Sequence, residues 1–194
     1  MARHVFLTGL PGVGKTTLIH KSIDTLKSAG VPIVGFYTEE VRINGRRIGF
    51  DVVTVSGKRG TLSRTRNDAG SGRCEYRVGQ YAVDVSSFEC LVLPLFTKVN
   101  GKDDKEKKLY VIDEIGKMEL FSERFVQAVR QILDTTGATI LGTIPVPKGK
   151  SLCLVEDIRS RRDVKIFNIT KDNRNSIAQE IITTVQDCRK LNGM

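Results

Sequence analysis

The chain has no long apolar run. Its longest apolar stretches, such as Leu91–Phe96, fall far short of the roughly 20 residues that a membrane span requires. The segment Met1–Leu10 leads directly into a glycine-rich turn and does not have the pattern of a secretory signal. We therefore expect no membrane association, and a cytoplasmic location.

Cysteine is scarce and scattered. Cys74, Cys90, Cys153 and Cys188 form no C-x-x-C pair, and only two histidines accompany them. This pattern indicates neither a zinc site nor a disulfide framework. We expect four free thiols.

Tryptophan is absent, and four tyrosines and eight phenylalanines leave few rings for stacking on nucleic-acid bases. The formal net charge is nevertheless +9, and residues 42–77 carry nine basic side chains against three acidic ones. A basic surface attracts polyanions, and both nucleoside triphosphates and nucleic acids are polyanions. Because no recognised nucleic-acid module is present, we expect a nucleotide partner rather than a nucleic acid.

A length of 194 residues suits a single domain spanning 1–194, and 40% apolar with 27% charged residues is typical of a globular protein. Apolar strand patterns alternate with amphipathic helix patterns, which favours an α/β fold with a mostly parallel sheet and helices on both faces. The predicted strands cover 4–8, 32–38, 109–113, 139–143 and 164–168, and the predicted helices cover 15–29, 86–99, 122–137 and a stretch around 177–185.

Two segments depart from this alternation. The β-rich runs 36–43 and 46–55 are joined by Asn44-Gly45, which predicts an antiparallel β-hairpin. Glycines then punctuate the chain up to Gly79, so the hairpin insert is expected at about 36–80. Pro94 lies inside a predicted helix and indicates a kink or an early end there. The mixed-charge run 101–108 is predicted to be a solvated loop.

The turn after the first predicted strand matches the G-x-x-x-x-G-K-[ST] phosphate loop, and a helix pattern follows it as that motif requires. Its glycines let backbone N–H groups surround phosphates, and the helix amino terminus adds partial positive charge. Lys15 is expected to reach the β and γ phosphates as a catalytic residue, and the Thr16 hydroxyl to ligate Mg²⁺. The predicted nucleotide-binding residues are Gly9, Leu10, Pro11, Gly12, Val13, Gly14, Lys15, Thr16 and Thr17.

Two adjacent carboxylates follow a second buried strand pattern. Asp113 lies where a Walker B aspartate is expected, and we predict that it ligates Mg²⁺ together with Thr16. Glu114 is then well placed to orient or deprotonate an attacking water as the catalytic base. The alternative is that Glu114 only caps the strand end or forms a salt bridge there.

Further polar residues are candidates for the same site. Thr143 ends a predicted strand and could contact the γ phosphate or the water, although its hydroxyl could equally satisfy its own backbone. One arginine among those near the hairpin turn and before the last strand could stabilise the transferring phosphoryl group. The candidates are Arg46, Arg47, Arg159, Arg161 and Arg162.

The run 113–116 also fits the D-x-x-G motif of GTPases. A GTPase would read guanine with N-K-x-D, and the nearest match here is 170–173, which places its acid one position early. The sequence therefore does not support guanine specificity.

Four segments together resemble one family, the small P-loop nucleoside-triphosphatases: 9–16, 35–42, 45–50 and 111–119. The likeness spans the whole chain, and Asn173-Arg174 after the last strand also fits it. The resemblance implies a RecA-like core with a catalytic glutamate after the Walker B aspartate. It also implies Mg²⁺-dependent hydrolysis of several nucleoside triphosphates with weak base preference, so the expected ligands are ATP, GTP, CTP, UTP and TTP. We also expect a monomer.

Two alternatives remain open. Many small-molecule and nucleotide kinases begin with the same loop, and residues 42–77 could supply an acceptor pocket and an arginine-bearing lid. Glu114 argues against a kinase, because it makes most sense activating water. The basic hairpin keeps a nucleic-acid-dependent ATPase in consideration, for which salt-sensitive binding and stimulated hydrolysis would be the evidence.

Overall fold

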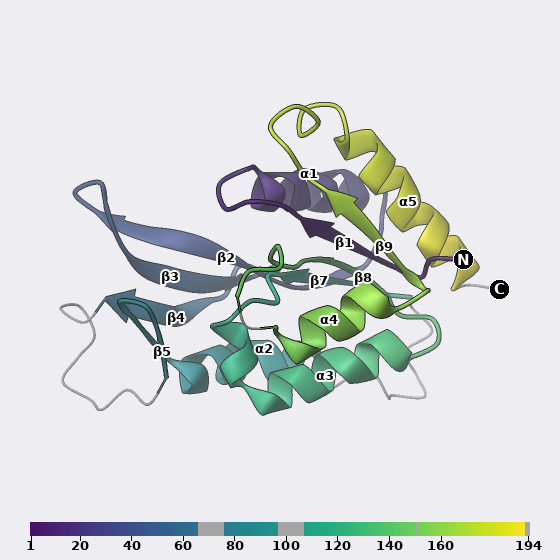
Figure 1. The fold of residues 1–194 in the computed structure, drawn as a ribbon. Coiled ribbons are helices and arrows are strands. Elements are labelled where there is room, and N and C mark those ends of the chain that lie inside the picture. The colour runs from purple at the N-terminus through teal and green to yellow at the C-terminus, as the bar shows by residue number, and fades with distance from the viewer. Residues whose placement is uncertain (66–75, 97–106, 150, 193–194) are drawn as a thin grey trace.

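The computed structural model describes residues 1–65, 76–96, 107–149 and 151–192 (Figure 1). Within them a nine-stranded sheet has the order β5-β6-β4-β3-β2-β7-β8-β1-β9. The strands are β1 (His4–Thr8), β2 (Ile33–Ile43), β3 (Arg46–Thr54), β4 (Arg59–Thr65), β5 (Arg77–Val78), β6 (Tyr81–Val83), β7 (Leu109–Asp113), β8 (Thr139–Thr143) and β9 (Val164–Asn168).

Half of the sheet is parallel. Strands β2, β7, β8, β1 and β9 all run in the same direction, with β8 between β1 and β7. Every residue of β1, β7 and β8 is buried, as expected of strands that helices cover on both faces. The carboxyl ends of these strands meet at one edge of the sheet, which brings Thr8, Asp113 and Thr143 to the same place.

Helices cover both faces of the parallel strands (Figure 1). One face carries α1 and α5, and the other carries α2, α3 and α4. Because side chains alternate along a strand, Phe6 of β1 packs on the second face while Val5 and Leu7 pack on the first. The helices are α1 (Lys15–Ser28), α2 (Val85–Phe96), α3 (Glu123–Asp134), α4 (Cys153–Ser160) and α5 (Ala178–Leu191).

An aromatic cluster fixes α2 and α3 to the sheet. Phe36 of β2 makes edge-on contacts with Phe88 of α2 and Phe125 of α3, at centroid distances of 5.6 and 5.9 Å. All three rings are buried, and full burial of each contributes about 1.5–3 kcal/mol. The predicted cap of α3 is confirmed, because the Ser122 side chain accepts a hydrogen bond from the Phe125 N–H.

The antiparallel half of the sheet contains the predicted hairpin. Asn44 and Gly45 join β2 to β3 with φ of 50° and 77°, the left-handed values that a tight hairpin turn requires. The predicted strands 32–38 and 36–43 are one continuous strand, since β2 pairs with β7 on one side and with β3 on the other. The hairpin projects away from the parallel strands (Figure 1).

Other predictions need correction. Helix α2 does not end at Pro94 but continues to Phe96, whose buried ring lies 6.4 Å from that of Phe36. Packing of Phe96 into the core therefore outweighs the helix-breaking effect of proline within the last turn. Helix α4 was not predicted at all. Most of the loop predicted at 101–108 lies outside the described residues, as do residues 97–99 of the predicted helix.

The structure also bears on two expectations drawn from composition, on membrane-spanning helices and on cysteine. No helix among the described residues has the length and apolar character needed to cross a bilayer. Cys90, Cys153 and Cys188 are free thiols, whereas Cys74 lies outside the described residues.

Candidate functional site

The phosphate loop connects β1 to α1 at the carboxyl edge of the parallel strands. Gly9 has φ of 153°, and a Cβ there would lie 2.4 Å from the Ile169 carbonyl oxygen, so only glycine fits. Gly14 caps α1 with φ of 111°, and no side chain accepts a hydrogen bond at this cap. The first turn of α1 also lacks an acidic residue. The amino terminus of α1 is therefore suited to an anionic ligand.

Lys15 spans the loop. Its Nζ donates hydrogen bonds to the carbonyl oxygens of Gly9, at 2.9 Å, and Leu10, at 3.2 Å. The ammonium is thus held over the concave side of the loop, where a phosphate chain would lie. Thr16 and Thr17 follow in the first turn of α1, with Thr16 half-buried and Thr17 exposed.

Asp113 ends β7 and is buried, with 2% of its surface exposed. Its Oδ1 accepts a hydrogen bond from the Thr143 hydroxyl at the end of β8. Its Oδ2 has no hydrogen-bond partner among the described residues. Burial raises the pKa of the Asp113 carboxyl, while the hydroxyls of Thr143 and Thr16 and the charge of Lys15 act in the opposite direction. Thr143 therefore holds Asp113 in place and leaves one carboxylate oxygen available.

Glu114 shares its surroundings with another carboxyl that the sequence did not identify. A Cβ added to Gly116 would lie 2.6 Å from Glu114 Oε1 and 3.1 Å from Glu119 Oε2, so both carboxyls flank the Gly116 backbone. Glu119 accepts a hydrogen bond from the Gly116 N–H at 3.1 Å and is 3% exposed. Burial, followed by the charge of Asp113, raises the pKa of Glu114.

Burial, followed by the charge of Glu114, raises the pKa of Glu119 to about 8. Glu119 lies in the short 3₁₀ helix Glu119–Phe121 and carries no sequence motif that marks it as functional. Its apolar neighbours Met118 and Leu120 were the only signal that its carboxyl would be buried.

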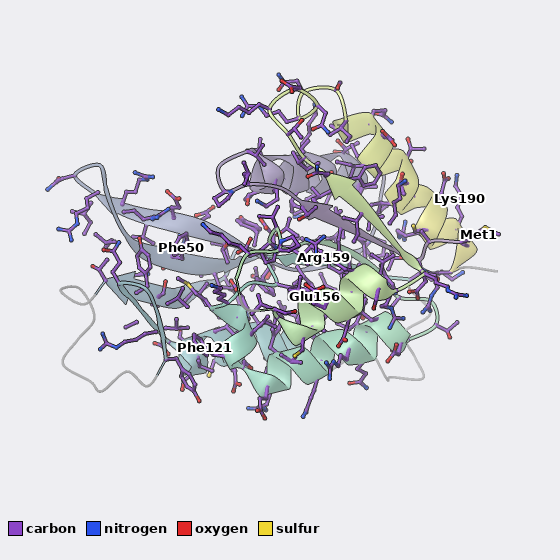
Figure 2. All side chains as sticks on the ribbon, viewed as in Figure 1. Met1, Phe50, Phe121, Glu156, Arg159 and Lys190 are labelled. Atoms are coloured by element: carbon purple, nitrogen blue, oxygen red, sulfur yellow. The ribbon has the colours of Figure 1, made fainter. Side chains whose placement is uncertain are left out.

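One of the candidate arginines lies at this edge. Arg159 belongs to α4, and its Nη2 donates to the Thr8 hydroxyl at 3.0 Å and to the Pro145 carbonyl at 2.7 Å. Its Nε is buried without a hydrogen-bond partner among the described residues. Figure 2 shows Arg159 directed from α4 towards the sheet. The residues before the phosphate loop and after β8 thus hold this guanidinium.

The other arginines lie elsewhere. Arg162 and Arg161 precede β9, at the edge where the parallel strands begin, and Arg161 is bound by Asp163 and Asp134 at 2.9 and 2.7 Å. Arg46 lies beside the hairpin turn, and Arg47 donates to the Tyr81 hydroxyl at 2.8 Å. The structure therefore brings Arg159 to the loop, and it does not bring Arg46 or Arg162 there.

Comparison with known proteins assigns the chain to a family. A sequence model of the family described as NTPase matches residues 4–182. The human cancer-related nucleoside-triphosphatase is 64% identical over 190 residues, which cover 98% of this chain and 100% of that protein.

Two solved structures share the fold. The solution structure of a human cancer-related nucleoside triphosphatase matches with a TM-score of 0.83 and 63% identity, covering 96% of this chain and 98% of that one. The crystal structure of THEP1 from the hyperthermophile Aquifex aeolicus matches with a TM-score of 0.80 and 36% identity, covering 94% of this chain and 99% of that one. The predicted α/β fold, with a mostly parallel sheet flanked by helices, is confirmed, and the chain belongs to the NTPase family.

Proposed function

We propose that this protein hydrolyses the terminal phosphate of nucleoside triphosphates. The observation that carries the proposal is the pair Asp113 and Glu114 at the end of β7. One strand, β8, separates β7 from the strand that leads into the phosphate loop. A terminal phosphate held by the loop would therefore face a carboxylate able to accept a proton from water. Relatives named as nucleoside-triphosphatases support the same conclusion.

Mg²⁺ is the cofactor that this proposal requires, and the available donors fit it. Mg²⁺ prefers oxygen ligands and is commonly held by one or two carboxylates together with substrate phosphates. Asp113 Oδ2 is a buried carboxylate oxygen without a hydrogen-bond partner among the described residues, and the Thr16 hydroxyl is close enough to lower the pKa of the Asp113 carboxyl. The described residues contain no group of three His, Cys, Asp or Glu side chains suited to a metal, so substrate phosphates would complete the site. When bound, Mg²⁺ neutralises developing charge on the phosphates.

Lys15 and Glu114 would have separate roles in the reaction. Lys15 would bind the β and γ phosphates in place of the loop carbonyls that it now contacts. Glu114 would take a proton from the water whose oxygen forms the new bond to the γ phosphorus, while the bond to the β–γ bridging oxygen breaks and the diphosphate leaves. Its raised pKa makes the Glu114 carboxylate a stronger base than an exposed glutamate.

Arg159 is the arginine that best fits a role in stabilising charge on the transferring phosphoryl group. It lies against Thr8, the residue before the phosphate loop, and its Nε has no described partner. Guanidinium groups bind phosphoryl oxygens in a forked geometry that lysine does not reproduce.

We further propose that ATP, GTP, CTP, UTP and TTP are all substrates, with weak base preference. The sequence lacks the N-K-x-D motif that reads guanine, and the names of the relatives specify no base.

The test is phosphate release from ATP, GTP, CTP and UTP, each assayed separately without acceptor and without nucleic acid, in Mg²⁺ and again in excess EDTA. We expect release from all four nucleotides in Mg²⁺ and its loss in EDTA. Release that required a nucleoside or nucleotide acceptor would favour a kinase. Release that required nucleic acid would favour a nucleic-acid-dependent ATPase.

A further inference from the structure

The position of the catalytic carboxylates sets the direction of the nucleotide on the loop. Asp113 and Glu114 follow β7 and Thr143 ends β8, so all three lie on one side of β1. Strand β9 lies on the other side of β1. If the terminal phosphate points towards the carboxylates, as the proposed function requires, the nucleoside must leave the loop on the β9 side. The segment between β9 and α5 is therefore the part of the chain that the nucleoside meets.

This segment is fixed against the phosphate loop. The Ile169 N–H donates to the Thr8 carbonyl at 2.7 Å, and the close approach of Ile169 to Gly9 leaves no room for a side chain at that position. The following turn is closed by hydrogen bonds from the Thr170 N–H to Asn173 Oδ1 at 2.9 Å and from the Arg174 N–H to the Thr170 carbonyl at 3.1 Å. A turn held in this way presents its side chains in a defined position next to the loop.

Arg174 extends from this turn across the end of the phosphate loop. Its Cδ lies 3.6 Å from where a Cβ on Gly14 would be, and its Nη1 makes one long hydrogen bond of 3.5 Å to the Val13 carbonyl. The residue is exposed and forms no ion pair within the described parts of the chain. A guanidinium with a single weak contact, beside the last loop residues before α1, remains available to a ligand.

We propose that the Arg174 guanidinium stacks on the face of the nucleobase. Guanidinium groups stack on aromatic planes, and every base offers such a face, so this contact binds without selecting a base. The amide of Asn173, which could have read a base edge, is occupied within the turn. Its Oδ1 accepts from Thr170, and its Nδ2 donates to the Asn168 carbonyl at 2.8 Å. Base stacking without edge recognition accounts for the weak base preference in the proposed function, on which this inference rests.

The test compares a ligand that has a base with one that has none. Binding of ADP and of pyrophosphate, each with Mg²⁺, is measured by titration calorimetry for the wild type, Arg174→Ala and Arg174→Lys. Loss of stacking should weaken ADP binding about tenfold in Arg174→Ala and leave pyrophosphate binding unchanged. Arg174→Lys should restore little, because lysine keeps the charge but not the planar group. GDP, CDP and UDP should lose affinity by factors similar to that of ADP.

Unchanged pyrophosphate binding also shows that the variant is folded, and Arg130→Ala on α3 controls for the loss of one positive charge. An equal loss for ADP and pyrophosphate would identify Arg174 as a phosphate contact and overturn the proposal. Unchanged ADP binding in Arg174→Ala would mean that Arg174 only supports the loop, and this result would also overturn the proposal. If the wild type bound neither ligand, the proposed function itself would fail and this inference with it.

Discussion

Polar side chains near the two ends of β1 differ in their hydrogen bonding. At the amino end, Arg3 donates to Asp163 at 2.7 Å and to the Leu133 carbonyl at 3.1 Å, and His4 has both ring nitrogens in hydrogen bonds. At the carboxyl end, Asp113 Oδ2 and Arg159 Nε are buried without hydrogen-bond partners in the described parts of the chain. These are two of the four such side-chain atoms among the described residues.

This difference teaches how one strand serves both stability and chemistry. A buried polar group that lacks a hydrogen bond costs roughly 1–3 kcal/mol. Paired groups at the amino end avoid that cost and fix β1 to its neighbours. Groups at the carboxyl end bear the cost, which a bound nucleotide and its metal would relieve. Substitutions at the two ends should therefore separate stability from activity.

The largest effect is expected at the carboxyl end, from Lys15→Ala. Removing the ammonium should lower the rate of hydrolysis about 10²–10³-fold and weaken nucleotide binding, because Lys15 would no longer reach the β and γ phosphates. Urea unfolding should change little. Steady-state phosphate release measures the first effect, and normal activity in this variant would refute the phosphate-loop assignment.

At the amino end, His4 should make stability depend on acidity. Burial lowers the pKa of His4 from 6.5 to about 4, and the Ile140 N–H donates to Nδ1 at 3.2 Å, which requires the neutral ring. The unfolded chain therefore binds more protons between pH 6.5 and 4, so stability falls as pH falls through that window. The expected loss from this group is about 2 kcal/mol by pH 5 and about 3 kcal/mol by pH 4.

Urea unfolding at several pH values measures this loss. The variant His20→Asn serves as a control, because His20 is the only other histidine of the chain. Glu119 has the opposite pH dependence in this window, so the comparison is made in the double variant His20→Asn, Glu119→Gln. If stability were flat from pH 7 to 5 in that double variant, the neutral, buried state of His4 would be wrong.

Two arginines sharpen the comparison, since they lie near opposite ends of the parallel strands. Arg159→Ala should slow hydrolysis by about 10²-fold, because it removes a guanidinium placed to meet the transferring phosphoryl group. Arg162→Ala removes the same charge at the other edge and should alter the rate by less than about twofold, as is usual for an exposed residue. Rates measured at saturating MgATP decide this, and equal losses in both variants would remove the distinction.

Glu119 should give the opposite pH dependence to His4. Its pKa is raised from 4.5 to about 8, so the folded protein binds more protons than the unfolded chain between those values. Stability should therefore fall as pH rises from 5 to 8, by about 3–4 kcal/mol. Glu119→Gln keeps an acceptor for the Gly116 N–H and should abolish this slope. A variant with the wild-type slope between pH 5 and 8 would contradict the assignment.

The parallel core was predictable because local patterns agree with the tertiary structure. The strands 4–8, 109–113, 139–143 and 164–168 were predicted with the bounds that the structure shows. Asn44-Gly45 predicted the hairpin turn, because few other residue pairs adopt positive φ at low cost. Glycine and strand patterns are local properties, and a single sequence records them directly.

What the sequence could not supply depends on contacts between distant segments. Pro94 indicated a kink or an early helix end, but α2 continues past it to Phe96, whose ring packs in the core. Arg174 fits the family resemblance, but its position beside the phosphate loop emerges only when the chain brings Gly14 next to it. Arg159 and Arg162 are only three residues apart along the chain, yet they lie at different edges of the sheet. Only the fold therefore distinguishes these two among the five candidate arginines.

The central claim is that Glu114 activates the attacking water, and one measurement tests it most directly. The rate of phosphate release at saturating MgATP is compared between the wild type and Glu114→Gln, in preparations shown to bind MgADP equally. The account predicts a fall of at least about 100-fold, because glutamine cannot accept the proton. A rate within a few-fold of the wild type would contradict the account and assign the water to another group.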